Sequence, residues 1–184
     1  PFTNPDLLNP GTHSMVIYNR AEGFTFDGRM ARVNAPDGKS RADGASVIPL
    51  PGYLKTVSQE ITVTADDTLR VNPVPQQRVR DLQLELEVTQ GRPELIQSVT
   101  ATLSGIAGVF DMEKGQTIGE PTSTVFSFTR DGSKLTADAR LLGTMGAVQT
   151  LVLDIVFTDG GRTQRTEVDL TEALADFNGD MTTA

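Results

Sequence analysis

The feature that most constrains the fold is a strict alternation of apolar and polar side chains. It is clearest in LQLELEV, residues 82–88, where four apolar side chains face one way and three polar ones face the other. A period of two is typical of a strand in an antiparallel sheet with one buried face and one face in water. The pattern recurs over residues 99–103, 126–128, 135–141 and 151–157. These runs predict an antiparallel, all-β protein.

Turn signals separate these strand-like runs. Asp131-Gly132 and Asp159-Gly160 each join two runs over a short gap, and this composition is typical of tight hairpins that need a positive φ. Further turn residues lie at 90–93 and 114–115. The C-terminal part therefore reads as a β-sandwich rich in hairpins.

One short helix is predicted over residues 169–177. Asp169 or Thr171 can cap its start. Helical spacing would place four apolar side chains on one face, those of Leu170, Ala173, Leu174 and Phe177. We expect this helix to cover an open end of the sandwich.

Small residues interrupt the strand that begins at Val99. Gly105-Ile106-Ala107-Gly108 follows the alternating run 99–103 directly. Glycines at 105 and 108 permit a bulge or a crossing where the chain leaves one sheet. We interpret the segment as a corner of the sandwich and not as a ligand-binding loop.

The N-terminal part has fewer strand signals. Short apolar runs lie at 15–18, 24–26 and 61–64, whereas residues 34–54 are mostly Gly, Pro, Ser, Asp and Ala. Such strands are too few to close a sandwich alone, so this part either packs on its neighbour or lacks strands ahead of Met15. Two prolines in Asn72-Pro73-Val74-Pro75 bar a continuous ladder. We predict two β-sandwich-like domains, residues 1–74 and 75–184, of which the first is the incomplete one.

Composition excludes several classes of function. The formal net charge is −8, and the acidity lies in the C-terminal part, because residues 1–77 carry 7 basic and 8 acidic side chains against 9 and 16 in residues 78–184. An acidic chain without a basic, aromatic patch is repelled by nucleic acids and by anionic membranes. No apolar run approaches the roughly 18 residues of a membrane-spanning helix. A signal or lipid anchor ahead of Pro1 stays open.

Residues for catalysis or metal binding are scarce. The chain has no cysteine, so it has no disulfide, thiolate site or Cys nucleophile, although this does not decide its compartment. His13 is the only histidine, and we interpret it as structural or exposed. Gly38-Lys39-Ser40 resembles the end of a phosphate-binding loop, but Val33 stands where that motif needs glycine.

The acidic residues are better explained by turns than by sites. Residues 176–180, DFNGD, have oxygen ligands at alternate positions as a calcium loop does, but Met181 stands where the loop needs glycine. The favoured reading there is a frayed acidic tail. The pairs Asp66-Asp67 and Asp154/Asp159 could suggest glycosidase carboxylates, yet Asp66-Asp67 lies in a hairpin-like turn sequence and Asp159 precedes Gly160, so turn chemistry accounts for them. We therefore predict no catalytic, cofactor-binding or metal-binding residues and a protein that is not an enzyme.

Three motifs in order resemble a known family. Residues 10–24, PGTHSMVIYNRAEGF, resemble the PGTY, YN and EG hairpin of the fimbrillin-A-associated anchor and accessory proteins of Bacteroidales type V fimbriae. Residues 98–108, SVTATLSGIAG, resemble the ATLSG-x-AG segment of that family's second domain. Residues 124–128, 141–146 and 168–171 are similar to its closing strands, glycine turn and capped helix.

The resemblance implies two successive transthyretin-like or immunoglobulin-like β-sandwich domains. It also implies export to the cell surface and outer membrane, with a lipid anchor that would lie outside this sequence. A member of this family would act in fimbrial assembly or adhesion. Its partners would be fimbrial subunits or other surface proteins, taken up by addition of a β-strand to an exposed sheet edge.

A carbohydrate-binding surface module of a glycan-utilisation system is the alternative function. Exported β-sandwiches often bind sugars, and such a site needs aromatic side chains exposed together in a groove. The aromatic residues that could supply it are Phe24, Phe26, Tyr18 and Tyr53.

Overall fold

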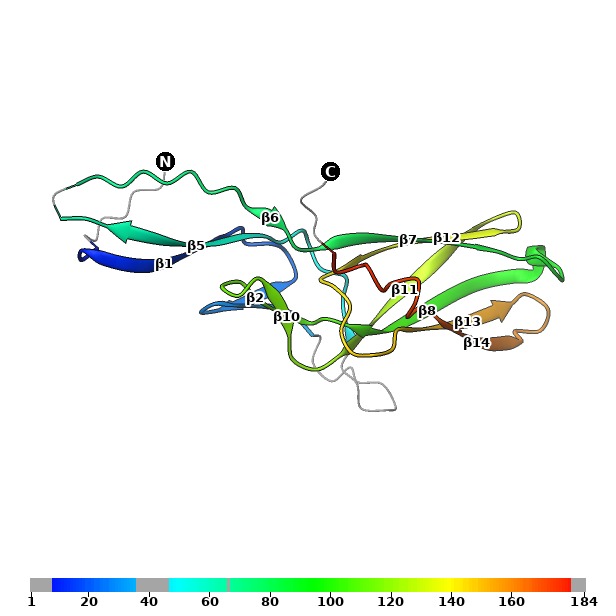
Figure 1. The fold of residues 1–184 in the computed structure, drawn as a ribbon. Helices are drawn as coiled ribbons and strands as arrows, with labels where there is room; N and C mark the ends of the chain where they lie inside the picture. Colours follow the sequence, from blue (N-terminus) through cyan, green and yellow to red (C-terminus); the bar gives the residue numbers. More distant parts are fainter. Residues whose placement is uncertain (1–7, 36–46, 66, 180–184) are drawn as a thin grey trace.

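The protein is an elongated, all-β molecule. The computed structural model describes residues 8–35, 47–65 and 67–179, and within these ranges it contains strands, one short 3-10 helix (η1, Pro93–Leu95) and no α-helix. The N-terminal strands lie at one end and the largest sheet at the other (Figure 1). All strand pairings of the described residues are antiparallel except that between β4 (Val47–Ile48) and β11 (Thr122–Asp131). The prediction of an antiparallel, all-β fold is confirmed.

The largest sheet has the strand order β14-β13-β8-β11-β12-β7. Besides β11, its strands are β7 (Arg80–Glu87), β8 (Ile96–Ile106), β12 (Lys134–Leu141), β13 (Thr150–Phe157) and β14 (Thr163–Asp169). Tight turns at Gly132 and Gly160, both with positive φ, join β11 to β12 and β13 to β14. Both hairpins therefore form where the Asp-Gly pairs predicted them.

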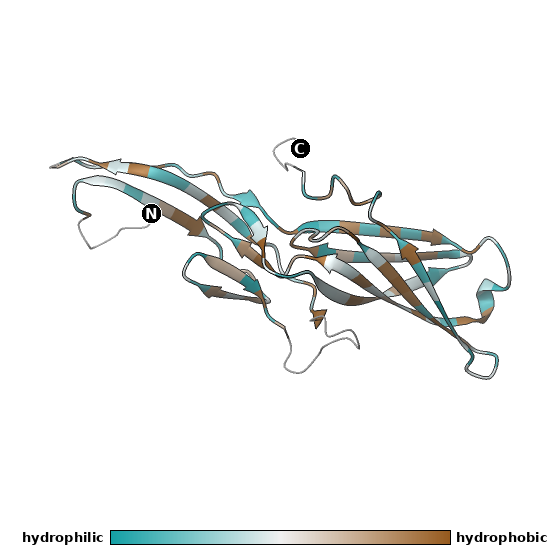
Figure 2. Ribbon diagram, turned by 60° about the horizontal axis from the view of Figure 1, so that its bottom comes forward, coloured by the Kyte–Doolittle hydropathy of each residue, from teal (hydrophilic) through white to brown (hydrophobic). Residues whose placement is uncertain are grey.

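Hydrophobic and hydrophilic residues alternate along these strands (Figure 2), and this alternation sets which side chains are buried. In β7, Leu82 is buried and Leu84 and Leu86 are half-buried, whereas the residues between them are exposed. The sheet curls so that apolar residues of its strands share one core, which includes Val99, Leu103, Phe126, Leu135 and Leu151. Its strands β7 and β14 remain unpaired on their outer edges among the described residues.

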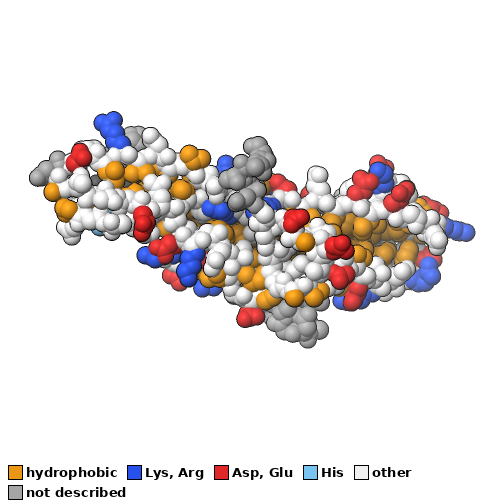
Figure 3. Space-filling model, viewed as in Figure 1, with side chains coloured by type: hydrophobic (Ala, Val, Ile, Leu, Met, Phe, Trp, Pro, Cys, Tyr) orange, Lys and Arg blue, Asp and Glu red, His pale blue; other side chains and the backbone are white. Residues whose placement is uncertain are grey.

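One side of this curled sheet stays open. Figure 3 shows apolar side chains gathered between the part formed by β7 and β12 and the part that carries β13. On the strands of this sheet, four half-buried residues pack against the core but are not fully covered: Leu84, Leu86, Ile155 and Phe157. Burial of apolar surface is therefore incomplete at this end of the molecule.

The N-terminal strands form two smaller sheets. One has the order β1-β5-β6, with β1 (Gly11–Tyr18), β5 (Lys55–Val63) and β6 (Gln76–Gln77). The other has the order β10-β9-β3-β2, with β2 (Phe24–Asp27), β3 (Met30–Val33), β9 (Val109–Asp111) and β10 (Gln116–Ile118). Strands from both sides of position 74 thus share a sheet, and β4 likewise pairs with β11. The division into domains 1–74 and 75–184 stays a prediction.

The corner predicted at residues 105–108 is present. The pairing of β8 with β11 shifts so that Ile106 lies opposite Thr122 and Ser104 opposite Ser123, which makes Gly105 the extra residue of a bulge. After Ile106 the chain leaves the large sheet and enters β9 of the four-stranded sheet. Gly105 has a φ of 72°, in the left-handed region that favours glycine.

The predicted helix over residues 169–177 is wrong. Residues 171–178 form successive turns instead. Their backbone bonds include Leu174 N–H to the oxygen of Leu170 and Phe177 N–H to that of Leu174, so they do not repeat with one helical period. Only about nine residues were available, and a segment this short is a poor helix nucleus. Three of the four predicted apolar side chains still reach the core, because Leu174 is buried and Leu170 and Phe177 pack against it, whereas Ala173 is exposed.

Candidate functional site

The polar residues singled out in the sequence do not converge on a catalytic centre. His13 on β1 donates from Nε2 to the carbonyl oxygen of Asn9, 2.8 Å away. Asp154 lies 3.7 Å from Arg165, and Asp159 pairs with Arg162 at 2.9 Å. Among residues 8–35, 47–65 and 67–179, no three His, Asp or Glu side chains are grouped so that they could hold a metal ion.

Several of these sequence candidates fall outside the described residues. They are Gly38-Lys39-Ser40, Asp66 and Asp180. Asp67 is described, and its Oδ1 accepts the backbone N–H of Thr68 at 2.7 Å. The turn predicted for this acidic pair stays a prediction, because Asp66 lies outside the described residues.

The four candidate aromatic residues are divided between two places. Tyr18 stacks on Phe26 with 4.7 Å between ring centroids, and Phe24 lies 6.2 Å from Phe26. Phe24 is buried, and these three rings pack the β1 sheet against the β2 sheet. Tyr53 is not part of this group. The structure therefore does not bring the four rings together in one groove.

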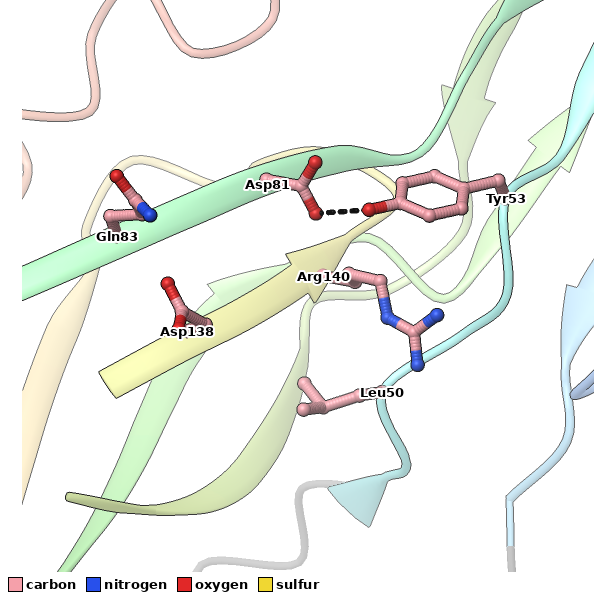
Figure 4. Close-up of a pocket in the computed structure, with 6 residues that line it drawn as sticks. All are labelled: Leu50, Tyr53, Asp81, Gln83, Asp138 and Arg140. Atoms are coloured by element: carbon pink, nitrogen blue, oxygen red, sulfur yellow. Dashed lines mark hydrogen bonds between the residues drawn. The ribbon is translucent and has the colours of Figure 1, made fainter. Parts of the chain in front are cut away.

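Tyr53 instead borders a hollow of about 520 Å³ on the outer face of the β7/β12 pair (Figure 4). The hollow is lined by Leu50, Tyr53, Asp81, Gln83, Asp138 and Arg140. Asp81 lies opposite Arg140 in the strand register, and Gln83 lies opposite Asp138. These positions alternate with the buried leucine and alanine residues of the two strands, so they project away from the core.

Tyr53 is held in place by contacts at both ends. Its hydroxyl donates to Oδ1 of Asp81 at 2.7 Å, and its carbonyl oxygen accepts the side-chain amide of Asn19 at 2.9 Å. The guanidinium of Arg140 lies 5.5 Å from the centroid of its ring. The pKa of Tyr53 is raised, chiefly because the hydroxyl donates to Asp81 and also because that negative charge disfavours the phenolate.

Sequence reasoning named Tyr53 but missed the polar residues of the hollow. Asp81, Gln83, Asp138 and Arg140 occupy the polar positions of two alternating strands, and on sequence alone they look like an ordinary solvent-exposed face. The only available signal was that both strands carry charged or amide side chains at consecutive outward positions. The pairing of 81 with 140 and of 83 with 138 needed the register.

A second candidate site is the outer edge of β1. β1 is the end strand of its sheet, and no other strand of the described residues pairs with that edge. The backbone N–H of Asn19 donates to the carbonyl oxygen of Lys55 on β5. Because every second pair of an antiparallel ladder is hydrogen-bonded, the backbone groups of residues 17, 15 and 13 also point toward β5. The backbone N–H and C=O groups of residues 12, 14 and 16 then point to the free edge.

Both faces of β1 and β5 carry half-buried side chains. Met15 and Ile17 share a face with Val57 and Ile61 of β5, and each of these four is only partly covered. Figure 3 shows apolar side chains gathered at this end of the molecule. The edge thus combines free backbone groups with partly exposed apolar side chains, which are the two requirements for pairing with another strand.

Comparisons with known proteins define the fold. No protein-family model matches the sequence, and no curated protein matches it. The fold is shared with a putative adhesin from Bacteroides ovatus, with a TM-score of 0.74, 17% sequence identity and coverage of 91% of this chain and 68% of that one. It is shared with the fimbrial anchor protein Mfa2 from Porphyromonas gingivalis, with a TM-score of 0.57, 13% identity and coverage of 95% and 65%.

These likenesses show a common fold. The chain spans about two thirds of the length of each of the two proteins. No helix among the residues that the structure describes is long and apolar enough to cross a membrane.

Proposed function

We propose that this chain is a non-enzymatic, cell-surface adhesion or fimbrial subunit that joins its partner by addition of a β-strand. The observation that carries the proposal is the fold, which the chain shares with an adhesin-type protein and with a fimbrial anchor. The sequence motifs at 10–24 and 98–108 resemble the same group of proteins. A place at the outer membrane, with export and a lipid anchor beyond this sequence, belongs to the same proposal.

The free edge of β1 is the proposed point of strand addition. An incoming strand would bond to the backbone groups of residues 12, 14 and 16, and its alternate side chains would cover the half-exposed apolar residues Met15 and Ile17. The β1 sheet has three strands, one of them only two residues long, so a fourth strand would add substantial hydrogen bonding. The N-terminal unit is accordingly the incomplete one in this proposal.

A proline scan of β1 tests the idea. Ser14 is exposed and its N–H points to the free edge, so Ser14→Pro removes a donor for an incoming strand and leaves the bonds to β5 in place. Ser14→Ala is the matched control, because it loses the same hydroxyl, which donates to Glu113 at 2.9 Å, but keeps the N–H.

The assay uses synthetic peptides that copy the termini of surface proteins encoded by the neighbouring genes. We expect at least one peptide to raise the Tm of the wild type and of Ser14→Ala, and to raise that of Ser14→Pro far less. A Tm that no peptide shifts at saturation, or an equal shift in all three proteins, would contradict strand addition at β1.

A further inference from the structure

The hollow beside Tyr53 contains polar groups that the fold leaves without partners. The side chains of Asp138 and Gln83 are exposed and make no hydrogen bond with any residue that the structure describes. Arg140 faces Asp81 across the strand pair but turns toward Tyr53, and its described contact is with that ring (Figure 4). Three side chains with hydrogen-bonding capacity thus line one hollow, and their donors and acceptors face water.

The charges in the hollow select against charged ligands. An anion would be drawn to Arg140 but would lie against the carboxylates of Asp81 and Asp138. A cation would be drawn to those carboxylates but would lie against the guanidinium of Arg140. A neutral molecule whose groups both donate and accept hydrogen bonds can satisfy all of them, because hydroxyls donate to carboxylates and accept from Arg and from the Gln83 amide.

Apolar surface borders the polar groups. Leu50 is half-buried, and Tyr53 is 42% exposed, so part of its ring faces water. A volume of about 520 Å³ lies within the range of small-molecule sites, roughly 300–1,000 Å³. A sugar ring can interact with both parts of the hollow, because its C–H groups pack on apolar surface and its hydroxyls form hydrogen bonds with polar side chains.

We infer that the hollow of Tyr53 is a binding site for a neutral saccharide. Gln83 on β7 and Asp138 on β12 bind its hydroxyls, Arg140 donates to its oxygens, and Leu50 and Tyr53 contact its C–H groups. The bond from Tyr53 to Asp81 holds the ring in position before the ligand arrives. With one aromatic wall and a site open to water, binding of a single short saccharide is weak, and adhesion gains strength from many copies acting together.

The test starts with a glycan array that carries neutral oligosaccharides and acidic ones with sialic acid, uronic acid or sulfate. We expect binding to neutral glycans and weaker or no binding to acidic ones. Calorimetric titration of the strongest neutral glycan then compares the wild type with Asp138→Asn and Arg140→Gln. Each variant should lose about tenfold or more in affinity, since each removes a hydrogen bond made by a charged group.

Two controls separate this proposal from general effects. Glu87→Gln removes one negative charge, as Asp138→Asn does, from the face of the sheet that carries the hollow. Glu87 lies opposite Lys134 and does not line the hollow, so this variant should change the affinity by less than about twofold. Ser14→Pro lies at the edge of β1 and should leave glycan binding unchanged, so strand addition and saccharide binding fail independently. Melting curves establish that each variant is folded before its affinity is compared.

Three results would overturn the inference. One is an array on which no neutral glycan binds. Another is a preference for acidic glycans over neutral ones. The third is a neutral glycan that binds Asp138→Asn and Arg140→Gln as tightly as the wild type, because the saccharide would then occupy a different site.

Discussion

Replacing Gly105 with alanine should destabilise the protein far more than the same change at other glycines with positive φ. Gly105 is the bulge residue of β8, between the pairs Ser104–Ser123 and Ile106–Thr122 with β11. A Cβ atom built there lies 2.2 Å from the carbonyl oxygen of Val148 and 3.1 Å from its carbonyl carbon. Both are backbone atoms that cannot move without shifting the start of β13. Gly115 is the matched control, because its φ of 69° is similar and its Cβ would meet nothing within 4 Å.

The expected loss in the free energy of unfolding has two parts. A side chain in the left-handed region costs about 1–2 kcal/mol at either position. The clash adds roughly 1–3 kcal/mol at Gly105 alone, as overpacking in a rigid core does. The bulge also carries two accepted bonds, because Met145 N–H donates to the oxygen of Gly105 at 2.8 Å and the Gln149 amide lies 3.5 Å from it. We therefore expect Gly105→Ala to lose about 3 kcal/mol or more and Gly115→Ala about 1 kcal/mol.

Urea denaturation followed by circular dichroism measures both variants against the wild type. In thermal melts the difference corresponds to a Tm lower by roughly 6–12 °C for Gly105→Ala and by about 2–4 °C for Gly115→Ala. Equal losses in the two variants would refute the reasoning, because the close approach of Val148 would then contribute nothing. A loss at Gly115 alone would refute it as well.

Two further predictions concern the C-terminal turns. Leu174→Ala should lower the free energy of unfolding by about 2–4 kcal/mol, because this side chain is 5% exposed and packs in the core, and a loss below about 0.5 kcal/mol in urea would show that the turns contribute no core. The pKa of Asp169 is lowered because Thr171 donates to its carboxylate, so its stabilising effect is present above the ordinary value of 3.8 and is lost as the pH falls below it. The Tm of Asp169→Asn should therefore fall less than that of the wild type as the pH is lowered below about 4. An equal fall of Tm in the two proteins would contradict this assignment.

The sequence predicted the strands of the large sheet because their alternation is long and local. Residues 82–88 and 135–141 show it fully, and β7 and β12 bury the expected side chains. A strand with one face in the core and one face in water has this alternation in its sequence, whichever strands it pairs with. The Asp-Gly turns then fixed which neighbouring strands pair.

Short strands could not be predicted in this way. β4 has two residues and β9 has three, which is too few for any period to be read. Their positions depend on partners that are distant in the sequence, β11 for β4 and β3 for β9. The hollow has the same origin, since Tyr53 meets Asp81 and Arg140 through tertiary contacts that no local pattern records.

The apolar spacing over residues 170–177 was real but was assigned to the wrong structure. It places Leu170, Leu174 and Phe177 on the core, as a helix would. Turns bury the same side chains because hydrogen bonds to residues distant in the sequence hold the segment in place. Asn178 exchanges bonds with the backbone of Thr144 at 2.8 and 2.9 Å, and Leu170 N–H donates to the oxygen of Gln149. Such bonds are invisible to helical periodicity.

The pairing of β3 with β9 has a consequence for how fast the chain folds. Residues 30–33 emerge from the ribosome long before residues 109–111, which provide the neighbouring strand. Pairing between strands so distant in the sequence is slow, because the intervening loop must first be closed. Until β3 and β9 meet, the four-stranded sheet lacks its central pairing, and the apolar side chains of its strands stay exposed. The meeting of these two strands is therefore expected to limit how fast the N-terminal sheets form.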